Sequence, residues 1–247
     1  PLFYQPHAAT PYSVASRGLG DVYKRQITLP DAAALGKSVK AAIAAGIPVV
    51  SMNSGSDDFA KLGISAHVGQ TEFEAGVGGG QKMKAAGGKK ALCVNHEVGN
   101  VALDRRCAGF KKGFGGTVDI LGTSNDPTEI QSAVAAKLGG GYDTILTLGA
   151  GLSGEAALKA LEAAGKVGNV KLGTFDMSPN MLKAAAAGKV EFLIDQQQYL
   201  QGYLPIAIFA QYMRWGTMPA GVVMTGPGFV TPKNASAVIK WAAQGYR

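Results

Sequence analysis

The chain has 247 residues, which is enough for one large domain or for two medium-sized lobes with packed cores. Its 24 basic and 17 acidic residues leave a net charge of +7, and no basic block or helix-turn-helix pattern marks a nucleic-acid surface. No apolar run reaches the roughly 18 residues that a membrane span needs. We therefore expect a globular protein without a nucleic-acid partner, whose basic residues are solvated.

The first 26 residues show neither helical nor strand periodicity, and patterned sequence begins abruptly at Ile27. The segment SVASRGLGDVYKRQ within them resembles a translated sequencing adapter, as found at the ends of metagenomic reading frames. We predict that residues 1–26 are a non-native, disordered extension, and we leave them out of the fold prediction. The native N-terminus, including any signal peptide, is expected to be missing from this fragment.

From Ile27 onward, apolar segments alternate with Ala-rich stretches of helical spacing. Asp31 is a predicted N-cap, and Thr71 with Glu74 is a predicted capping box. The predicted helices cover 32–45, 72–84, 101–113, 127–138, 153–164, 178–187, 199–215 and 235–244. The predicted strands cover 47–52, 67–69, 91–95, 117–121, 143–148, 170–175, 190–195 and 222–227. This alternation predicts an α/β fold with doubly wound, mainly parallel sheets.

Several of the predicted strands end in polar residues. Asn53 and Asp176 follow two of them, Asn95-His96-Glu97 ends a third, and Asp195-Gln196 ends a fourth. In an open α/β sheet a ligand lies beyond the carboxyl ends of parallel strands, so these residues are candidate ligand contacts. Amides and carboxylates together suit a neutral, hydroxyl-rich ligand, because hydroxyl groups both donate and accept hydrogen bonds.

The two cysteines, Cys93 and Cys107, lie 14 positions apart, one in a predicted strand and the other in the helix that follows. Both can be small buried hydrophobic residues. Alternatively, they form one disulfide, which would imply an oxidising compartment. The sequence leaves these two alternatives open.

Enzymatic motifs are incomplete in this chain. His96-Glu97 lacks the second histidine of a metalloprotease helix, and only three histidines exist, so a histidine-based metal site is not expected. The stretch around Ser153 is one residue short of a nucleophile elbow and has no histidine partner. The glycines of 76–80 fall inside a predicted helix, where a phosphate-binding loop is not expected. We expect a protein that binds without catalysis, with no metal and no cofactor.

Five segments carry a family resemblance: IPVVSMNSGSD (47–57), HVGQTEFEAG (67–76), CVNHEVGNVALDRRCAGF (93–110), KLGTFDMSPNMLKAAAAGKVEFLIDQQQYLQGYLPI (171–206) and TGPGFVTPKNA (225–235). In this order and spacing they resemble the sugar-binding, ribose-binding-like members of the type I periplasmic binding proteins, the substrate-binding components of ABC transporters. The resemblance covers almost the whole chain from Ile27 onward.

The resemblance implies two hinged α/β lobes joined by three crossovers, near 87–91, 195–198 and 224–228. The N-terminal lobe would comprise 27–88 and 198–223, and the C-terminal lobe 89–195 and 226–247. Members of the family begin with two further βα units, so we expect a truncated N-terminal lobe with exposed strand edges.

The resemblance also implies particular ligand contacts. Arg106 matches the family's arginine on the first helix of the C-terminal lobe, and its alternative role is a surface salt bridge. Asp176 matches the strand-end aspartate, with a helix cap as its alternative. Gln196 matches the glutamine at the second crossover. Asn53 and Ser54 replace an aspartate and an arginine of ribose-type relatives, which argues against ribose and keeps a sugar-like ligand.

Four further residues complete the candidate ligand set. Phe175 would stack on a sugar face, or it is a core residue. Asn95, His96 and Glu97 would face the cleft, or they form a network that stabilises a turn. Where the family has an asparagine before the third helix of this lobe, the chain has Gly149-Ala150-Gly151, so a contact there would have to come from the backbone or be made by a differently shaped ligand.

These observations predict an extracytoplasmic solute-binding protein, a monomer that delivers a monosaccharide or similar polyol to an ABC permease. It would be periplasmic, or membrane-tethered in a Gram-positive source. The alternative is the ligand-sensing domain of a lactose-repressor-type regulator that lacks its DNA-binding headpiece. An α/β enzyme is the third reading, and it lacks any constellation of nucleophile and base.

Overall fold

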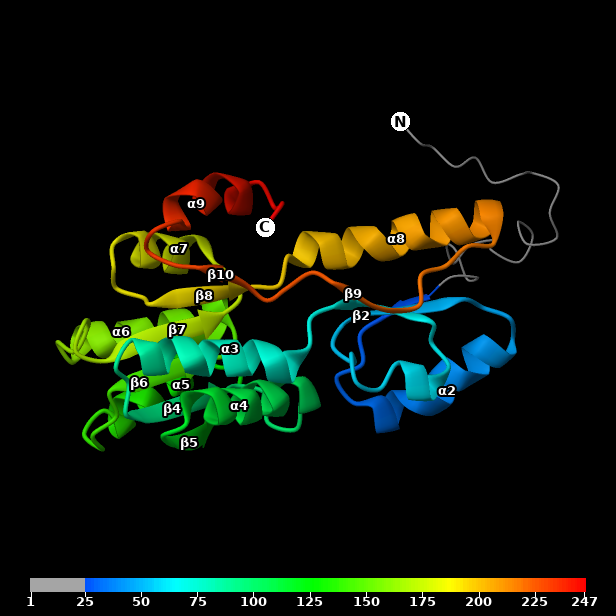
Figure 1. Ribbon diagram of the computed structural model, residues 1–247. Coiled ribbons are helices and arrows are strands. Elements are labelled where there is room, and N and C mark those ends of the chain that lie inside the picture. Colours follow the sequence, from blue (N-terminus) through cyan, green and yellow to red (C-terminus); the bar gives the residue numbers. More distant parts are fainter. Residues whose placement is uncertain (1–24) are drawn as a thin grey trace. The chain divides into compact units, whose positions relative to one another are not determined.

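The computed structural model describes residues 25–247, which form two compact units (Figure 1). The first unit contains the described residues 25–69 together with Leu200–Met224, and the second contains Gln70–Tyr199 and Thr225–Arg247. Most of the predicted non-native extension lies outside the described residues. Its last two residues, Arg25 and Gln26, belong to the first strand, β1 (Arg25–Ile27).

The first unit is a parallel sheet with one long helix on each face. Its strands, in the order β1-β2-β3-β9, are β1, β2 (Val49–Asn53), β3 (Ala66–Gly69) and β9 (Gly221–Met224). Val49 packs with α2 (Ala32–Ala44), whereas its neighbour Val50 packs with α8 (Gln198–Trp215). This division follows from the alternation of side chains along a strand. A short 3-10 turn (Ala60–Leu62) precedes β3.

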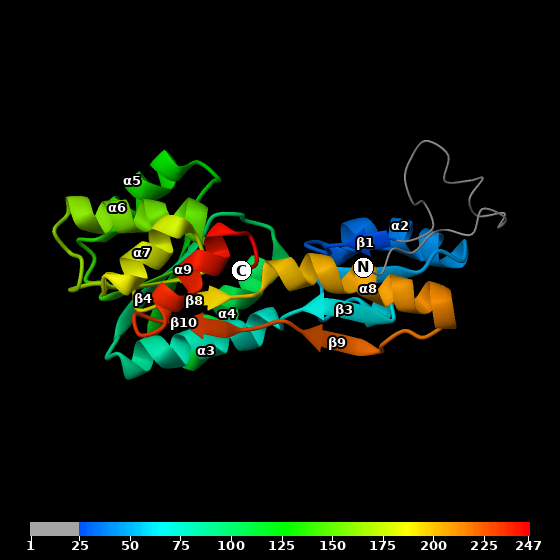
Figure 2. The same cartoon turned by 90° about the horizontal axis from the view of Figure 1, so that it is seen from above.

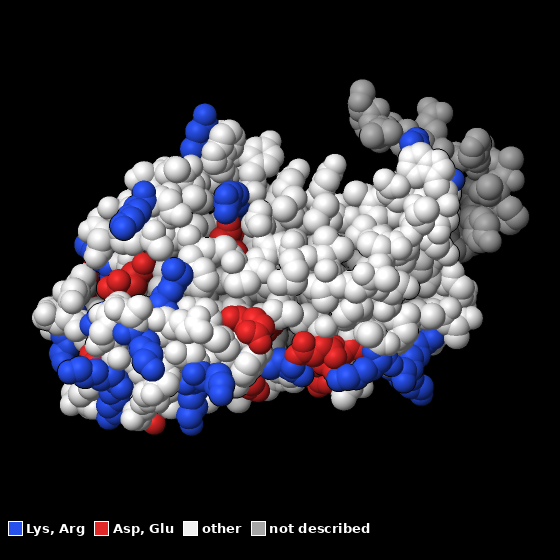
Figure 3. All heavy atoms as spheres, in the orientation of Figure 1, with Lys and Arg blue, Asp and Glu red and all other residues white. Residues whose placement is uncertain are grey.

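Among the described residues, no strand pairs with the outer edge of β1, and one face of α8 is exposed to solvent. β1 pairs only with β2 there, and Tyr203, Ile206 and Trp215 of α8 are exposed. Few charged side chains lie over α8 in Figure 3, in keeping with its single charged residue, Arg214. The truncation of this lobe stays a prediction.

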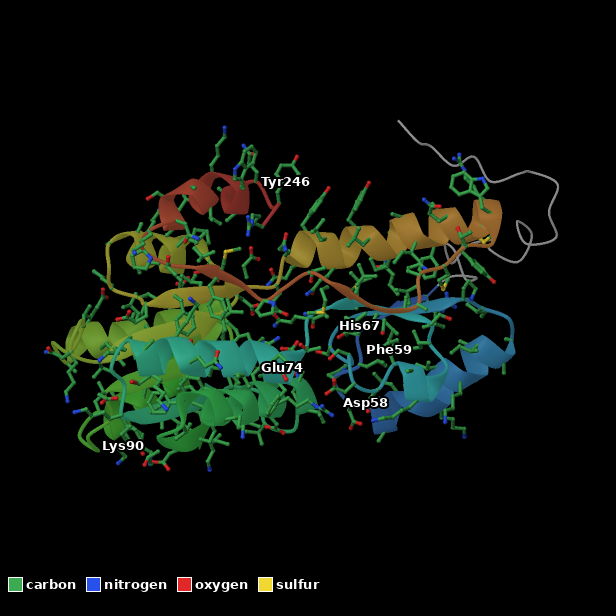
Figure 4. All side chains as sticks on the ribbon, in the orientation of Figure 1. Asp58, Phe59, His67, Glu74, Lys90 and Tyr246 are labelled. Atoms are coloured by element: carbon green, nitrogen blue, oxygen red, sulfur yellow. A yellow bond between two sulfur atoms is a disulfide. The ribbon has the colours of Figure 1, made fainter. Side chains whose placement is uncertain are left out.

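Two buried residues of the same sheet, Ser51 on β2 and His67 on β3, are hydrogen-bonded, with the Ser51 hydroxyl 2.9 Å from Nδ1 of His67. The His67 ring also lies 5.8 Å from the ring of Phe59, between centroids (Figure 4). Burial lowers the pKa of His67 to about 4, so this histidine is neutral at neutral pH and belongs to the core.

The second unit has a six-stranded sheet in the order β10-β8-β7-β6-β4-β5. Only β10 is antiparallel to its neighbour. The strands are β4 (Lys90–Asn95), β5 (Thr117–Gly122), β6 (Thr144–Thr147), β7 (Lys171–Phe175), β8 (Phe192–Asp195) and β10 (Gly228–Val230). This confirms a doubly wound, mainly parallel sheet.

Helices cover both faces of that sheet, as Figure 2 shows. α3 (Glu72–Ala85) and α4 (Val101–Phe114) lie on one face. The other face is covered by α5 (Pro127–Lys137), α6 (Glu155–Ala163), α7 (Pro179–Ala186) and α9 (Ala235–Ala243). In the sheet, β5 lies next to β4 on one side, and the following strand, β6, lies next to β4 on the other side. The order therefore reverses between β4 and β6, and such a switch point is where ligands bind in open α/β sheets.

The predicted elements are confirmed to within a few residues, whereas β1 and the short 3-10 turn were not predicted and four further features differ. The side chain of Asp31 caps α2 as predicted, by accepting from the amides of Ala33 and Ala34. The capping box is wrong, because Thr71 makes no side-chain cap bond and Glu74 is exposed (Figure 4). The last predicted strand ends at Met224, and β10 was not predicted. A five-residue π-helix (Ala150–Gly154) precedes α6.

The placement of α3 corrects the predicted lobe boundary. This helix was expected in the first lobe, but it packs against α4 in the second unit. Four glycines explain the packing: a Cβ added at Gly76 or Gly80 would lie within 2.4 Å of α4 backbone oxygens, and one at Gly109 or Gly113 within 2.1 Å of α3 backbone oxygens. Only glycine lets the two helix backbones approach this closely. The chain therefore changes unit after Gly69, well before the predicted 87–91.

We expect Gly109→Ala to lower the free energy of unfolding by at least about 2 kcal/mol, because the new methyl group would meet the carbonyl of Phe73 in a packed interface. Gly139→Ala is the matched control, since a Cβ there meets no atom within 4 Å, and a change of no more than about 1 kcal/mol is expected. Urea unfolding of both variants measures the difference. Equal stabilities would contradict the close helix contact.

Cys93 and Cys107 are joined by a disulfide that links β4 to α4, with a Cα–Cα distance of 5.9 Å. Both residues are buried in the same core cluster, on the face that α3 and α4 cover. The structure thus selects the disulfide over two separate thiols. It holds the carboxyl half of β4 against the helix that carries Arg106.

Reduction of this disulfide is expected to lower the free energy of unfolding by about 3 kcal/mol, the chain-entropy value for a loop of about 15 residues. The measurement is urea unfolding of the chain with and without a reductant, after a thiol assay under denaturing conditions has verified reduction. A reduced chain that unfolds at the same urea concentration as the oxidised one would contradict the expected contribution.

Candidate functional site

The three non-glycine residues with positive φ among those described all lie at carboxyl ends of strands. Asn53 ends β2 with φ 61°, Asp176 follows β7 with φ 65°, and Gln197 follows β8 with φ 54°. Left-handed backbone is costly for residues with a Cβ, and such strain concentrates at binding and catalytic sites. Asn53 and Asp176 are residues that sequence analysis had marked as ligand contacts.

Arg106 is buried, at 4% exposure. Its Nε donates to Oε2 of Glu72 at 2.6 Å and its Nη2 to Oε1 at 3.2 Å, so the two groups form a bidentate ion pair. Nη1 donates to the carbonyl of Leu148 at 3.1 Å. Three of the five N–H groups of a guanidinium are thereby used, and two are left to bind another group.

The electrostatics of Arg106 are set by this pair. Burial alone disfavours the charged form, but the carboxylate of Glu72 outweighs it, and the pKa of Arg106 rises above its ordinary value. Asp176 and Glu97 act in the same direction from further away. Arg106 is therefore charged, and its charge is already neutralised within the second unit.

Glu72 is the important residue that sequence analysis missed. It is buried at 3% exposure at the start of α3, where it also accepts from Nε2 of Gln70 at 3.1 Å. Its neighbour Glu74 was singled out because capping boxes have a recognisable spacing, whereas the partner of Glu72 lies 34 positions away. The alternative of a surface salt bridge for Arg106 is wrong, since its ion pair is buried.

Phe175 is fully buried, and its ring centroid lies 4.4 Å from the guanidinium carbon of Arg106. A ring without exposed surface has no face to offer a sugar, so the structure favours the core alternative for this residue. The ring stabilises the position of the Arg106 guanidinium through a cation–π contact.

Asp176 is half-buried and accepts two amide hydrogen bonds, both at Oδ1. One comes from Gln196, and the other comes from Gln198 at 2.8 Å. The alternative role as a helix cap belongs instead to Ser178, whose hydroxyl accepts from the amide of Met181. The carboxylate is therefore held in place by Gln196 and Gln198, with its other oxygen, Oδ2, uninvolved in these two bonds.

The two residues on either side of Gln196 have structural roles. Asp195 is fully buried and pairs with Arg247, whose Nε lies 2.9 Å from Oδ2. Gln197 donates its side-chain amide to the carbonyl of Thr225 at 2.6 Å. Of these three consecutive residues, Gln196 is the one that donates a hydrogen bond to Asp176.

The three residues after β4 differ in what they contact. Asn95 is buried, donates to Asp104 at 2.9 Å and accepts from the amide of Glu97 at 3.0 Å, so both ends of its side chain stabilise the turn. Glu97 is exposed and accepts from Asn100 at 3.1 Å. His96 is half-buried, with Nδ1 3.3 Å from the hydroxyl of Ser153, so the expectation that Ser153 has no histidine partner is wrong. The turn-network alternative describes Asn95 and Glu97.

Asn53 is in the first unit, where its amide donates to Gln201 at 3.1 Å and its carbonyl accepts from the hydroxyl of Ser54 at 3.2 Å. Gln201 is a buried residue of α8. Within the second unit, by contrast, the carboxyl edge of the sheet collects His96, Arg106, Asp176 and Gln196.

Residues 25–247 include no group of three or more His, Cys, Asp and Glu side chains that could hold a metal ion. None of the helices in this range combines the length and the apolar character required to cross a bilayer. On the face drawn in Figure 3, basic side chains of the second unit are interspersed with acidic ones.

We expect Glu72→Gln to destabilise the protein by about 3–5 kcal/mol, because it leaves the buried charge of Arg106 without its counterion. Glu162→Gln is the control: Glu162 pairs with Lys189 at 2.8 Å on the surface, and its replacement is expected to cost no more than about 1 kcal/mol. Urea unfolding curves compare the two variants. A cost for Glu72→Gln as small as that of the control would refute the assigned role.

Three comparisons place this architecture among known proteins. The family model of the periplasmic binding protein domain matches residues 27–217. A xylose/arabinose-binding protein from Sulfolobus acidocaldarius is 25% identical over 220 residues, which are 81% of this chain and 54% of that protein. The chain thus spans about half the length of this curated relative.

Solved structures show the same similarity. A carbohydrate transporter from Acidothermus cellulolyticus 11B, crystallised with myo-inositol, is 35% identical with a TM-score of 0.85, over 90% of this chain and 78% of that one. A periplasmic sugar-binding protein of an ABC sugar transporter from Legionella pneumophila is 25% identical with a TM-score of 0.70, over 81% and 77% of the two chains. This family implies an extracytoplasmic location. The chain belongs to the periplasmic binding protein domain family.

Proposed function

We propose that this protein binds a neutral monosaccharide or a similar polyol outside the cytoplasm and delivers it to an ABC importer, without catalysis. The observation that carries this proposal is the arrangement of Arg106 and Asp176 at the carboxyl edge of the second sheet. Both are charged hydrogen-bonding groups held rigidly by other side chains, as a binding site requires.

The charges at this edge favour an uncharged ligand. Arg106 is neutralised by Glu72, so it offers two directed N–H donors and little net attraction for an anion. Asp176 keeps Oδ2 as an acceptor after its two bonds to glutamine amides at Oδ1. Donors and acceptors side by side match vicinal hydroxyl groups, which both donate and accept.

The relatives support the same class of ligand. The structure from Acidothermus cellulolyticus contains myo-inositol, and the curated relative is named for xylose and arabinose. The disulfide between Cys93 and Cys107 agrees with an oxidising compartment. Closure of two hinged lobes on the ligand, a contact from Asn53, a monomeric state and tethering to a membrane are parts of this proposal that the family resemblance suggests.

Isothermal titration calorimetry against myo-inositol, D-xylose, D-arabinose and D-ribose tests the proposal. At least one of these ligands should bind, and Asp176→Ala should weaken its binding at least about tenfold, or roughly 1.4 kcal/mol. Asp176 is chosen because, unlike Arg106, it has no part in the buried ion pair. Asn53→Ala should weaken binding as well if the first unit contributes.

Asp119→Ala is the matched control, because Asp119 lies on β5 and accepts from the hydroxyl of Tyr142 on the surface. It should bind like the wild type. If no ligand of the panel binds, the proposed ligand class is wrong. If a ligand binds equally well to the wild type and to Asp176→Ala, the site assignment is wrong.

A further inference from the structure

His96 and Gly149 meet at the switch point of the second sheet. His96 is the first residue after β4, and Gly149 is the second residue after β6. β4 and β6 are the two neighbouring strands between which the strand order reverses. Crevices at such points bind ligands. The side chains available there are therefore the first that a ligand of this unit would meet.

The absence of a side chain at Gly149 makes room for the imidazole ring. A Cβ built on Gly149 would lie 3.0 Å from Cε1 and 3.3 Å from Nε2 of His96. Contacts this short are tighter than ordinary van der Waals contacts, so the ring would have to shift by a few tenths of an ångström. The φ of Gly149 is −162°, an extended value that any residue can adopt, so the requirement for glycine here is spatial.

The π-helix after Gly149 determines how the ring is held. Ser153, fully buried in that π-helix, donates its hydroxyl hydrogen to the carbonyl of Gly149 at 3.0 Å. Its oxygen can then only accept at the 3.3 Å contact with Nδ1 of His96, so Nδ1 carries the hydrogen. In the neutral ring this leaves Nε2 as a hydrogen-bond acceptor. Single-turn π-helices are frequent at functional sites.

The surroundings keep this ring neutral. Partial burial lowers the pKa of His96 below its ordinary value of 6.5. Of the charged groups around the ring, Glu97 and Asp176 oppose this shift, whereas Arg106 adds to it. Two of these groups, Arg106 and Asp176, are residues of the candidate site. At neutral pH, His96 therefore presents an uncharged acceptor, in contrast to the N–H donors of Arg106.

We propose that His96 determines specificity at this site: Nε2 accepts a hydrogen bond from one ligand hydroxyl, while Gly149 and Ser153 hold the ring in place. This inference rests on the proposed function and narrows it. The ligand must carry a hydroxyl that donates at this position, so an analogue that lacks this hydroxyl is rejected. Sites that hydrogen-bond a hydroxyl discriminate strongly against its absence, because the buried partner is left unpaired.

The test uses the tightest-binding ligand among myo-inositol, D-xylose, D-arabinose and D-ribose, measured by calorimetry with the full chain. His96→Phe keeps a ring of similar size without an acceptor nitrogen, and it should weaken binding at least about tenfold. Gly149→Ala should also weaken binding, because it displaces the ring. One monodeoxy analogue of the ligand should bind the wild type more weakly than the parent ligand does. His96→Phe should bind that analogue and the parent ligand equally well.

Two further measurements separate a ligand contact from a merely structural role. Wild-type affinity should be constant near neutral pH and should fall as the pH drops through the lowered pKa, because protonation removes the Nε2 acceptor; the affinity of His96→Phe should lack this dependence. In the ligand-free protein, imidazole 15N chemical shifts should show a protonated Nδ1 and an unprotonated Nε2. Should His96→Phe not fold, His96→Asn replaces it.

The outcomes distinguish the two proposals. If the wild type binds a ligand and a folded His96 variant binds it within twofold, or shows the same pH profile, the role of His96 is overturned while the proposed function stands. If the wild type binds none of the ligands, the proposed function and the role of His96 are both overturned, whichever ring nitrogen of His96 carries the hydrogen. If the 15N shifts show that Nε2 carries the hydrogen, the assignment of Nε2 as the acceptor is wrong, whatever the binding results.

Discussion

The contact between α3 and α4 is the constraint on which the second unit depends. Two glycines on each helix let the backbones touch, and every Cβ added there would lie within 2.4 Å of a backbone oxygen of the other helix. Because the helices are this close, Glu72 at the start of α3 reaches Arg106 in the middle of α4. A wider helix pair would leave a buried guanidinium without its counterion, which is one of the costliest defects in a protein interior.

This ion pair in turn gives the site its chemical character. Arg106 is fixed by Glu72 on one side, by the carbonyl of Leu148 on another and by the ring of Phe175 beneath it. Asp176 is fixed by glutamine amides. Charged groups that already have internal partners retain directional hydrogen-bonding capacity but little net field. Such an edge is suited to the proposed neutral, hydroxyl-bearing ligand better than to an ion.

The switch point adds a third kind of group, a neutral imidazole whose acceptor nitrogen is selected by Ser153. Arg106 can only donate, a carboxylate can only accept, and Nε2 of a neutral histidine accepts without carrying charge. Together they place complementary groups at the carboxyl ends of β4, β6 and β7. The disulfide from Cys93 to Cys107 ties the strand that precedes His96 to the helix that carries Arg106. The relative positions of these two side chains are thereby anchored covalently.

The alternation of strands and helices, the cap at Asp31 and the polar strand ends were all readable from the sequence, because each depends on residues close together in the chain. The polar residues at 53, 96, 176 and 196 were found in this way, as was the pair of cysteines, although their bond was left open. The family resemblance added the proposed ligand-binding roles of Arg106 and Asp176. It misplaced the first lobe boundary, since nothing local in Glu72–Ala85 tells which sheet this helix will cover.

Only the tertiary structure decided which of these residues have partners. Glu72 lies 34 positions from Arg106, and Ser153 lies 57 positions from His96. Neither pairing has a local spacing that a sequence pattern could reveal. The burial of Phe175 and the space at Gly149 likewise depend on side chains that arrive from other elements of the sheet. Local periodicity therefore determined the elements, whereas packing between distant segments determined which groups the candidate site presents.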